Sequence, residues 1–184
     1  MSWSAPWSAY RGYQAHPDPL VSASNSIALL IGSSQPFFPL YVWYFVSAEA
    51  ARISLLTFLT TPFFLAVPLV SRRNGTAGKA LLVATGAANT FACAKYFGPS
   101  TAVETFLLPC AMLATLSFRR AEYAVALSLL GGGLAAFLLF QGGYGTPLAA
   151  LSVAETASFA SLNIYSVAVL TAWIGWTFAS ARER

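Results

Sequence analysis

The chain has 184 residues, of which 57% are hydrophobic, 15% aromatic and only 9% charged. A soluble domain carries about 25% charged residues, so the composition excludes a water-exposed globular fold and indicates a membrane protein. The formal net charge of +4 comes from scattered basic residues at the ends of apolar segments. A nucleic-acid-binding surface would need them clustered, so we expect no nucleic-acid partner.

The sequence divides into a lead-in, a membrane-embedded region and a short tail. Residues 1–19 combine aromatic side chains with Arg11, which is typical of a segment at the lipid headgroup level. Residues 20–180 contain apolar stretches near the roughly 20 residues that a spanning helix needs, and residues 181–184 form the tail. The predicted spans are 21–47, 53–70, 78–97, 101–118, 122–140 and 153–179.

The basic residues predict the orientation. With six spans, both termini and two of the loops share one side with most of the arginines and lysines, and such residues concentrate in cytoplasmic loops. The residues on this side are Arg11, Arg72, Arg73, Lys79, Arg119, Arg120, Arg182 and Arg184, whereas Arg52 and Lys95 lie on the other. The sequence therefore predicts an all-α bundle of six transmembrane helices with cytoplasmic N and C termini.

The first span carries no charge but is interrupted by Asn25, Gln35 and the run Pro36–Pro39. Proline breaks the hydrogen-bond ladder of a helix, and in lipid the freed backbone groups need neighbouring helices. Because such breaks open cavities between helices, we expect this span to form one wall of any pocket.

Polar side chains inside lipid are costly, so they are candidates for a binding site. Asn89 and Asn163 lie at comparable depth in the third and sixth spans, and Gln35 lies in the outer half of the first. We expect them to hold the polar head of a ligand, although hydrogen bonding between helices also explains such residues. Aromatic side chains of the first span would line the apolar part, with packing or an interfacial aromatic belt as the alternative. The predicted ligand-binding set is Gln35, Phe38, Tyr41, Tyr44, Asn89, Glu104 and Asn163.

A second polar set lies near the predicted outer surface. Lys95 and Glu104 flank the turn at residues 98–100, so we expect an ion pair across it. Together with Glu155 and the loop 142–147, they form the site required by an alternative hypothesis, in which the chain is the substrate-binding subunit of a small-molecule importer.

Small residues form ridges on two of the predicted spans. Ala80, Ala84, Ala88 and Ala92 recur every four residues, and a triple glycine occupies residues 131–133. Such ridges let helices approach closely, so we expect a compact bundle. A further hypothesis uses these ridges as contact faces of a non-catalytic subunit in a larger membrane complex.

Catalysis and metal binding find little support. Cys93 and Cys110 lie apart in apolar segments, and the single histidine, His16, has only Asp18 nearby as a candidate proton partner. Metalloprotease and serine-hydrolase motifs are absent. We predict that the protein is not an enzyme and holds no metal or cofactor.

The residues around the first span resemble a known family. The resemblance is carried by Tyr13, Pro17, Leu20, Gly32, Pro36 and the run Pro39-Leu40-Tyr41-Val42-Trp43. They are similar to the start of the six-helix receptor domains of CqsS-type quorum-sensing histidine kinases and of membrane anchors that precede some bacterial adenylate cyclases. This resemblance implies a receptor-like or sensor module of the bacterial inner membrane that binds a small lipophilic ligand between its helices.

The resemblance also implies a downstream partner. Such receptors continue into a linker and a catalytic domain, whereas this chain stops at Arg184. We therefore expect either a separated sensor domain or a stand-alone relative that relays to a cytoplasmic effector. Its expected partners are the lipid bilayer, the ligand, and a second copy or another membrane or effector protein.

Overall fold

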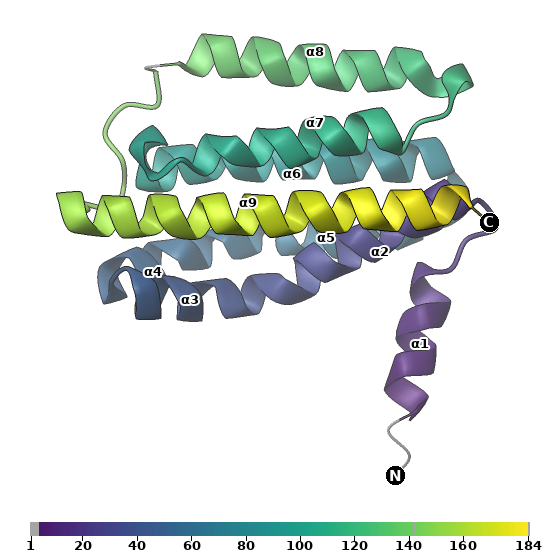
Figure 1. Ribbon diagram of the computed structural model, residues 1–184, viewed down its shortest axis with the longest axis horizontal. Helices are drawn as coiled ribbons and strands as arrows, with labels where there is room; N and C mark the ends of the chain where they lie inside the picture. The colour runs from purple at the N-terminus through teal and green to yellow at the C-terminus, as the bar shows by residue number, and fades with distance from the viewer. Residues whose placement is uncertain (1–3, 142, 184) are drawn as a thin grey trace.

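The computed structural model describes residues 4–141 and 143–183, all of them in helices or in the turns between helices. The helices lie side by side in an elongated bundle, from which α1 (Ser4–Gln14) projects at the end that also holds the C-terminus (Figure 1). We call this the termini end and the opposite one the loop end. Residues 1–3, 142 and 184, which the predicted lead-in, glycine-rich loop and tail include, lie outside the described residues.

Helical segments that follow one another end to end form what we call the rods of the bundle. The first rod contains the break that the prolines predict. α2 (Pro19–Ser34) is followed by a 3₁₀ turn, Gln35–Phe37, and by α3 (Phe38–Phe45). Pro36 and Pro39 occupy the opening positions of the turn and of α3, where a missing N–H costs no helical hydrogen bond.

The second rod starts earlier than predicted. α4 (Ala48–Ser54), a 3₁₀ turn (Leu55–Leu59) and α5 (Thr61–Arg73) follow one another closely, so the expected loop at residues 48–52 is wrong. Ser47 caps α4 by accepting a hydrogen bond from the Ala50 N–H, and alanine-rich sequence favours helix. The charges of Glu49 and Arg52 therefore lie on a helix, and the chain turns before them.

The remaining rods run between the two ends. They are α6 (Gly75–Phe97), α7 (Leu107–Leu116), α8 (Tyr123–Phe140) and α9 (Val153–Arg182). The predicted span 101–118 is α-helical only from Leu107, because Gly98 and Ala102 adopt positive φ angles of 86° and 55° and turn the chain through two short 3₁₀ segments. These segments, Pro99–Thr101 and Val103–Phe106, lie at the loop end.

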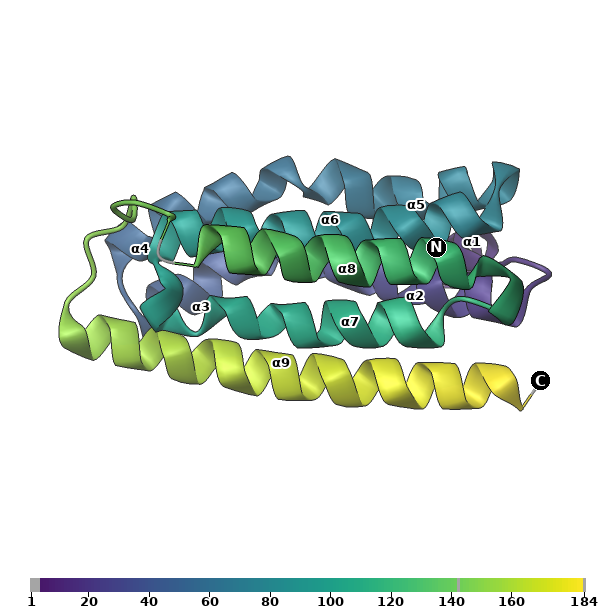
Figure 2. The ribbon, with the colours of Figure 1, turned by 90° about the horizontal axis from the view of Figure 1, so that it is seen from above.

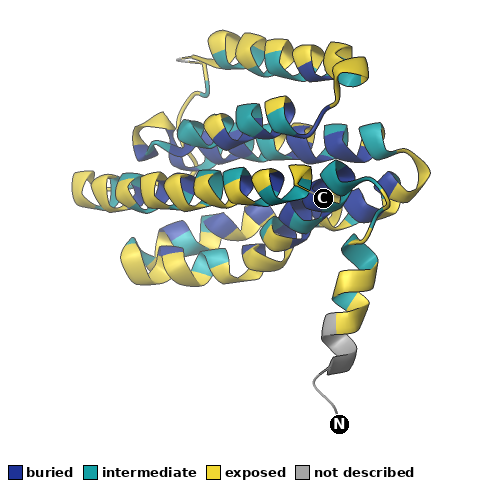
Figure 3. Ribbon diagram, turned by 45° about the vertical axis from the view of Figure 1, so that its right-hand side comes forward, coloured by how far each residue is buried: buried dark blue, intermediate teal, exposed yellow. Residues whose placement is uncertain are grey.

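Packing is uneven across the bundle. α6 contacts α2, α5, α7 and α8, and Figure 2 shows α5 and α9 on opposite sides of the bundle. α8 lies at the edge and is mostly exposed (Figure 3). In the most apolar 18-residue stretch of the segment Arg120–Phe140, which contains α8, only 6% is buried. Ala84 and Ala88 are exposed, and a Cβ at any of the three glycines 131–133 would meet nothing within 4 Å. Ala80 packs against the core, so the alanine ridge contributes to packing within the chain only in part, and the glycine ridge contributes no close contact.

Among the described residues, three helical segments are long and apolar enough to cross a membrane. They are Ala48–Arg73, Arg120–Phe140 and Val153–Arg182, and the apolar segment Val103–Leu116 is shorter. Their outward surfaces carry large apolar side chains such as Leu127, Leu139 and Val169. A surface of this kind suits a lipid environment.

Candidate functional site

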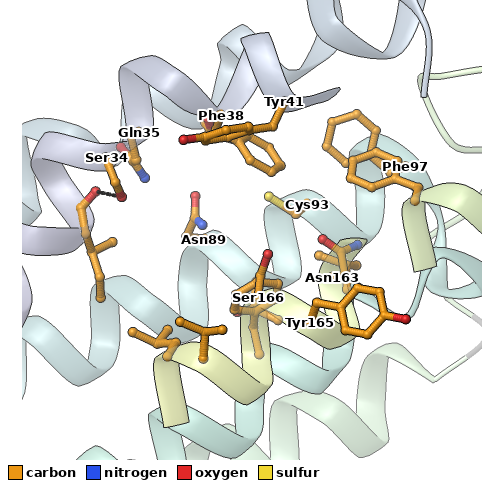
Figure 4. Close-up of a pocket in the computed structure, with 18 of the residues that line it drawn as sticks. Ser34, Gln35, Phe38, Tyr41, Asn89, Cys93, Phe97, Asn163, Tyr165 and Ser166 are labelled. Atoms are coloured by element: carbon orange, nitrogen blue, oxygen red, sulfur yellow. Dashed lines mark hydrogen bonds between the residues drawn. The ribbon is translucent and has the colours of Figure 1, made fainter. Parts of the chain in front are cut away.

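A cavity of about 650 Å³ lies between the broken first rod, α6 and α9 (Figure 4). Its volume falls within the range of small-molecule sites, about 300–1,000 Å³. Each rod contributes one face through helical spacing. These faces are Gln35, Phe38 and Tyr41 on the first rod, Asn89, Cys93 and Phe97 on α6, and Phe159, Asn163, Ser166 and Leu170 on α9.

Polar side chains beside the 3₁₀ turns of the first and second rods fix one edge of the cavity. The Gln35 amide donates to Thr60 Oγ1 at 3.0 Å, and the Thr61 hydroxyl donates to Gln35 Oε1. Thr60 Oγ1 lies 2.9 Å from Asn89 Oδ1 and 2.8 Å from the Thr57 carbonyl, and its single proton serves one of them at a time. These bonds join the first rod, the second rod and α6. They leave the Asn89 NH₂ group without a partner among the described residues.

The opposite edge is fixed by Asn163, which is 2% exposed. Its amide nitrogen donates to the Thr101 carbonyl at 2.8 Å, and a carbonyl only accepts, so this bond sets which way the amide faces. Figure 4 shows the amide oxygen of Asn163 on the side of Cys93, toward the cavity interior. No described group donates to this oxygen.

The cavity is therefore apolar with two polar points, a donor on Asn89 and an acceptor on Asn163. None of the described residues that line it is charged or is a histidine. The thiol of Cys93 has no base beside it, and the described residues contain no cluster of three or more metal-ligating side chains. This arrangement can bind an uncharged molecule with a polar group.

The cavity opens sideways, between the first rod and α9. Tyr41, Tyr165 and Trp173 line it and are 53%, 71% and 47% exposed. Tyr41 lies on α3, and Tyr165 and Trp173 lie in the interior of the 30-residue helix α9, away from its two ends. A molecule dissolved in lipid would meet this opening directly.

Five residues of the predicted ligand-binding set line the cavity, and two do not. Gln35, Phe38, Tyr41, Asn89 and Asn163 are brought together there. Tyr44 is 77% exposed and its ring packs edge-on against Phe45, at a centroid distance of 4.8 Å. It follows Tyr41 by one helical turn and lies at the end of α3, away from the cavity.

Glu104 also lies outside the cavity, and its predicted ion pair with Lys95 is wrong. The Tyr144 hydroxyl donates to Glu104 Oε1 at 2.8 Å, and the Lys95 ammonium donates to the Thr146 carbonyl at 2.8 Å. The loop after α8 folds over the turn at residues 98–100 and supplies both partners. Burial raises the pKa of Tyr144, and its hydrogen bond to Glu104 and the charge of Glu104 raise it further.

The predicted proton pair of His16 and Asp18 is replaced by other contacts. His16 Nδ1 accepts a hydrogen bond from the Asp18 backbone N–H at 3.0 Å. The Asp18 carboxylate instead caps α2 at Leu20 and pairs with Arg119 at 3.1 Å.

Other residues of the site were not singled out from the sequence. Thr60 and Thr61 stand directly before Pro62, so the threonine pair beside a helix-breaking proline was a usable signal. Thr101 acts through its backbone carbonyl, which no side-chain pattern reveals. Cys93 and Ser166 follow Asn89 and Asn163 by four and three residues, and this helical spacing places them on the same faces.

Comparison of the chain with protein-family models, with curated proteins and with solved structures gave no match. The functional assignment therefore rests on the cavity and on the arrangement of the helices around it.

Proposed function

We propose that this protein is a receptor-like membrane module that binds a small lipophilic ligand in the lateral cavity and relays its presence to a cytoplasmic partner. The observation that carries the proposal is an uncharged cavity that opens sideways and has two unpaired polar groups on its walls. These groups are the amide NH₂ of Asn89 and the amide oxygen of Asn163. A lipophilic molecule with a polar head would satisfy both groups.

The proposed membrane arrangement has six spans in the bacterial inner membrane, with both termini in the cytoplasm. It is supported by the three long apolar segments and by the side-by-side packing of the first rod, α6 and α7 with them (Figure 1). Basic residues at the termini end, including Arg72, Arg73 and Arg119, support the orientation.

The relay is supported by the shape of α9. This helix of 30 residues lines the cavity through Phe159, Asn163 and Ser166 and then continues unbroken to Arg182 at the termini end. A ligand that shifts or tilts α9 would therefore move the cytoplasmic end of the same rigid element.

The importer hypothesis has less support. It requires Lys95, Glu104 and Glu155 to be available to a substrate. Lys95 and Glu104 are bonded to the loop after α8, and Glu155 accepts a hydrogen bond from the Ser152 N–H at 2.8 Å as part of the α9 cap.

Filling the cavity tests the proposal. In Ser166→Phe, a ring would occupy the space that Ser166 faces, whereas Ser161→Phe places the same ring on the exposed side of the same helix. Both serines bond only to carbonyls of their own helix. We expect native mass spectrometry of the protein released from detergent to show a retained lipophilic molecule in wild type and in Ser161→Phe but not in Ser166→Phe.

Equal retention in both variants, or a wild-type protein that never carries a ligand, would overturn the assignment. Asn89→Leu provides an independent variant, because it removes the free N–H₂ group without filling the space. The topology is tested separately by single cysteines introduced after residue 46 and near residue 74, with a membrane-impermeant thiol reagent. We expect labelling of intact cells at the first position only.

A further inference from the structure

We propose that a second, smaller cavity at the termini end binds an uncharged, multiply hydroxylated group, such as the sugar or glycerol part of a lipid or a free polyol. This cavity of about 290 Å³ lies between the α1–α2 linker, α2 and α9. Its lining includes Gln14, His16, Ser22, Ser26 and Thr177. It shares no lining residue with the larger cavity.

The linker that forms one wall is held in place from several sides. Asn25 is 1% exposed and donates from Nδ2 to the Gln14 carbonyl at 3.0 Å. The Ser71 hydroxyl donates to Asn25 Oδ1 at 2.8 Å, and the Tyr13 hydroxyl donates to the Leu65 carbonyl at 2.8 Å. The wall is therefore built before any ligand arrives.

Two linker side chains present unused hydrogen-bonding atoms. Gln14 Oε1 is buried and has no partner among the described residues. His16 Nδ1 accepts from the Asp18 N–H, so the neutral ring carries its proton on Nε2. No described atom accepts that proton.

α2 and α9 add hydroxyl groups that also lack a hydrogen-bond partner among the described residues. Helical serines elsewhere, such as Ser24 and Ser128, donate to the carbonyl four residues earlier. Within the described part of the chain, Ser22, Ser26 and Thr177 make no such side-chain bond. Ser22 and Ser26 are four residues apart and so share one face of α2.

These groups specify the chemistry of the occupant. Gln14 Oε1 needs a donor, His16 Nε2 needs an acceptor, and the three hydroxyls serve as either. Hydroxyl groups of a ligand supply both roles, and pairing a buried polar group removes the cost of leaving it unsatisfied. No arginine or lysine is among the described lining residues, which disfavours a phosphate.

The single histidine of the chain provides a direct readout. The full-length protein labelled with ¹⁵N at His16 would be placed in nanodiscs of phosphatidylcholine, with or without monogalactosyl diacylglycerol, or exposed to free methyl galactoside. We expect the His16 Nε2 resonance to shift with the galactolipid and not with phosphatidylcholine alone. A shift with methyl galactoside as well would identify a free polyol as a competent source.

Variants connect the signal to the cavity. Ser22→Ala with Ser26→Ala removes two of the free hydroxyls, and we expect galactolipid binding to weaken about tenfold, the effect of one or two lost hydrogen bonds. Ser128→Ala with Ser161→Ala removes two hydroxyls that are already bonded within their helices and should leave binding unchanged. An unmoved His16 resonance in wild type, or equal binding in both double variants, would show that the cavity holds only water.

Discussion

The two halves of the bundle differ in how completely their helices close around a core. At the termini end, Phe64, Leu82, Ile174 and Phe178 are at most 1% exposed and form a closed core. Toward the loop end, a second cluster that includes Val42, Ala94 and Phe159 is as deeply buried. Between the two clusters the rods are interrupted by 3₁₀ turns, and the space beside one interruption stays open as the larger cavity. Uninterrupted helices can pack closely along their length, whereas a broken helix needs polar partners from its neighbours and leaves room between them.

A partly buried ion pair reinforces the closed end. The Lys79 ammonium, 1% exposed, lies 2.6 Å from Glu122 Oε2 and 5.1 Å from the centre of the Phe118 ring. Glu122 also accepts from the Thr76 hydroxyl and from the Arg119 N–H at 2.8 Å. The pair joins the start of α6 to the start of α8, so the exposed helix α8 is anchored at this end.

Two phenylalanine truncations test the comparison most strongly. Phe64→Ala removes a ring from the closed core, and we expect a loss of about 3–5 kcal/mol in the free energy of unfolding. Phe38→Ala removes a half-buried ring that already borders the cavity, so the expected loss is about 1 kcal/mol. Denaturant unfolding of the ligand-free protein in detergent measures both. Similar losses would mean that the helices are packed as densely around the cavity as in the closed core.

Removing one partner of the Lys79–Glu122 ion pair is the next largest test. Lys79→Met leaves the Glu122 carboxylate without its cation, and we expect a loss of about 2 kcal/mol in unfolding free energy. This is less than the roughly 3–5 kcal/mol of fully buried pairs, because Glu122 is 18% exposed and water can solvate its charge. Adding Glu122→Gln removes the stranded charge and should restore most of the loss. Arg120→Met, at an exposed position beside the pair, is the matched control. If the double variant is no more stable than Lys79→Met, the charge is not the cause.

At the loop end, Tyr144→Phe removes the hydrogen bond to Glu104 and should cost about 1 kcal/mol. The folded pKa of Tyr144 lies above its ordinary value of 10.0, so this residue's contribution is present at neutral pH and is lost as the pH rises above that value. In the variant, alkaline titration of tyrosinate absorbance should lose one tyrosine that ionises above the ordinary range. Tyr165→Phe, an exposed tyrosine, serves as control. A titration unchanged by Tyr144→Phe would contradict the contact.

The sequence anticipated the cavity where side-chain type and depth were enough. Gln35, Asn89 and Asn163 stood out because amides are rare in apolar segments, and prolines marked the break beside them. Prediction from the sequence failed where the partner of a side chain comes from a distant part of the chain. Lys95 and Glu104 are close in sequence, yet a loop some 40–50 residues further along captured both of them.

The small-residue ridges failed for a related reason. A period of four shows that a helix has a smooth face, but it does not tell which way that face points. In this structure Ala84 and Ala88 of α6 and the glycines of α8 face away from other helices, whereas Ala80 packs against the core. Similarly, the charges at residues 49 and 52 suggested a loop, whereas the serine cap before them began a helix.

The smallest expected effect belongs to the surface pair of Asp18 and Arg119. Burial raises the pKa of Asp18, but hydrogen bonds from Arg119 and from the Leu20 N–H, with the Arg119 charge, outweigh it and leave the pKa below its ordinary value. The stabilisation is therefore present at neutral pH and is lost as the pH falls through the range of that carboxyl. Because the Arg119 side chain is 59% exposed and water screens its charge, we expect only a small stabilisation.

Asp18→Asn isolates this charge, because asparagine caps a helix as well as aspartate does. Between about pH 6 and pH 3, which spans the titration of an aspartate, the wild-type protein should lose slightly more unfolding free energy than the variant, and added salt should reduce the difference. Parallel pH profiles would contradict an electrostatic role for the pair. The closed end would then depend on its apolar core and on Lys79–Glu122, and Asp18 would contribute only through its cap on α2.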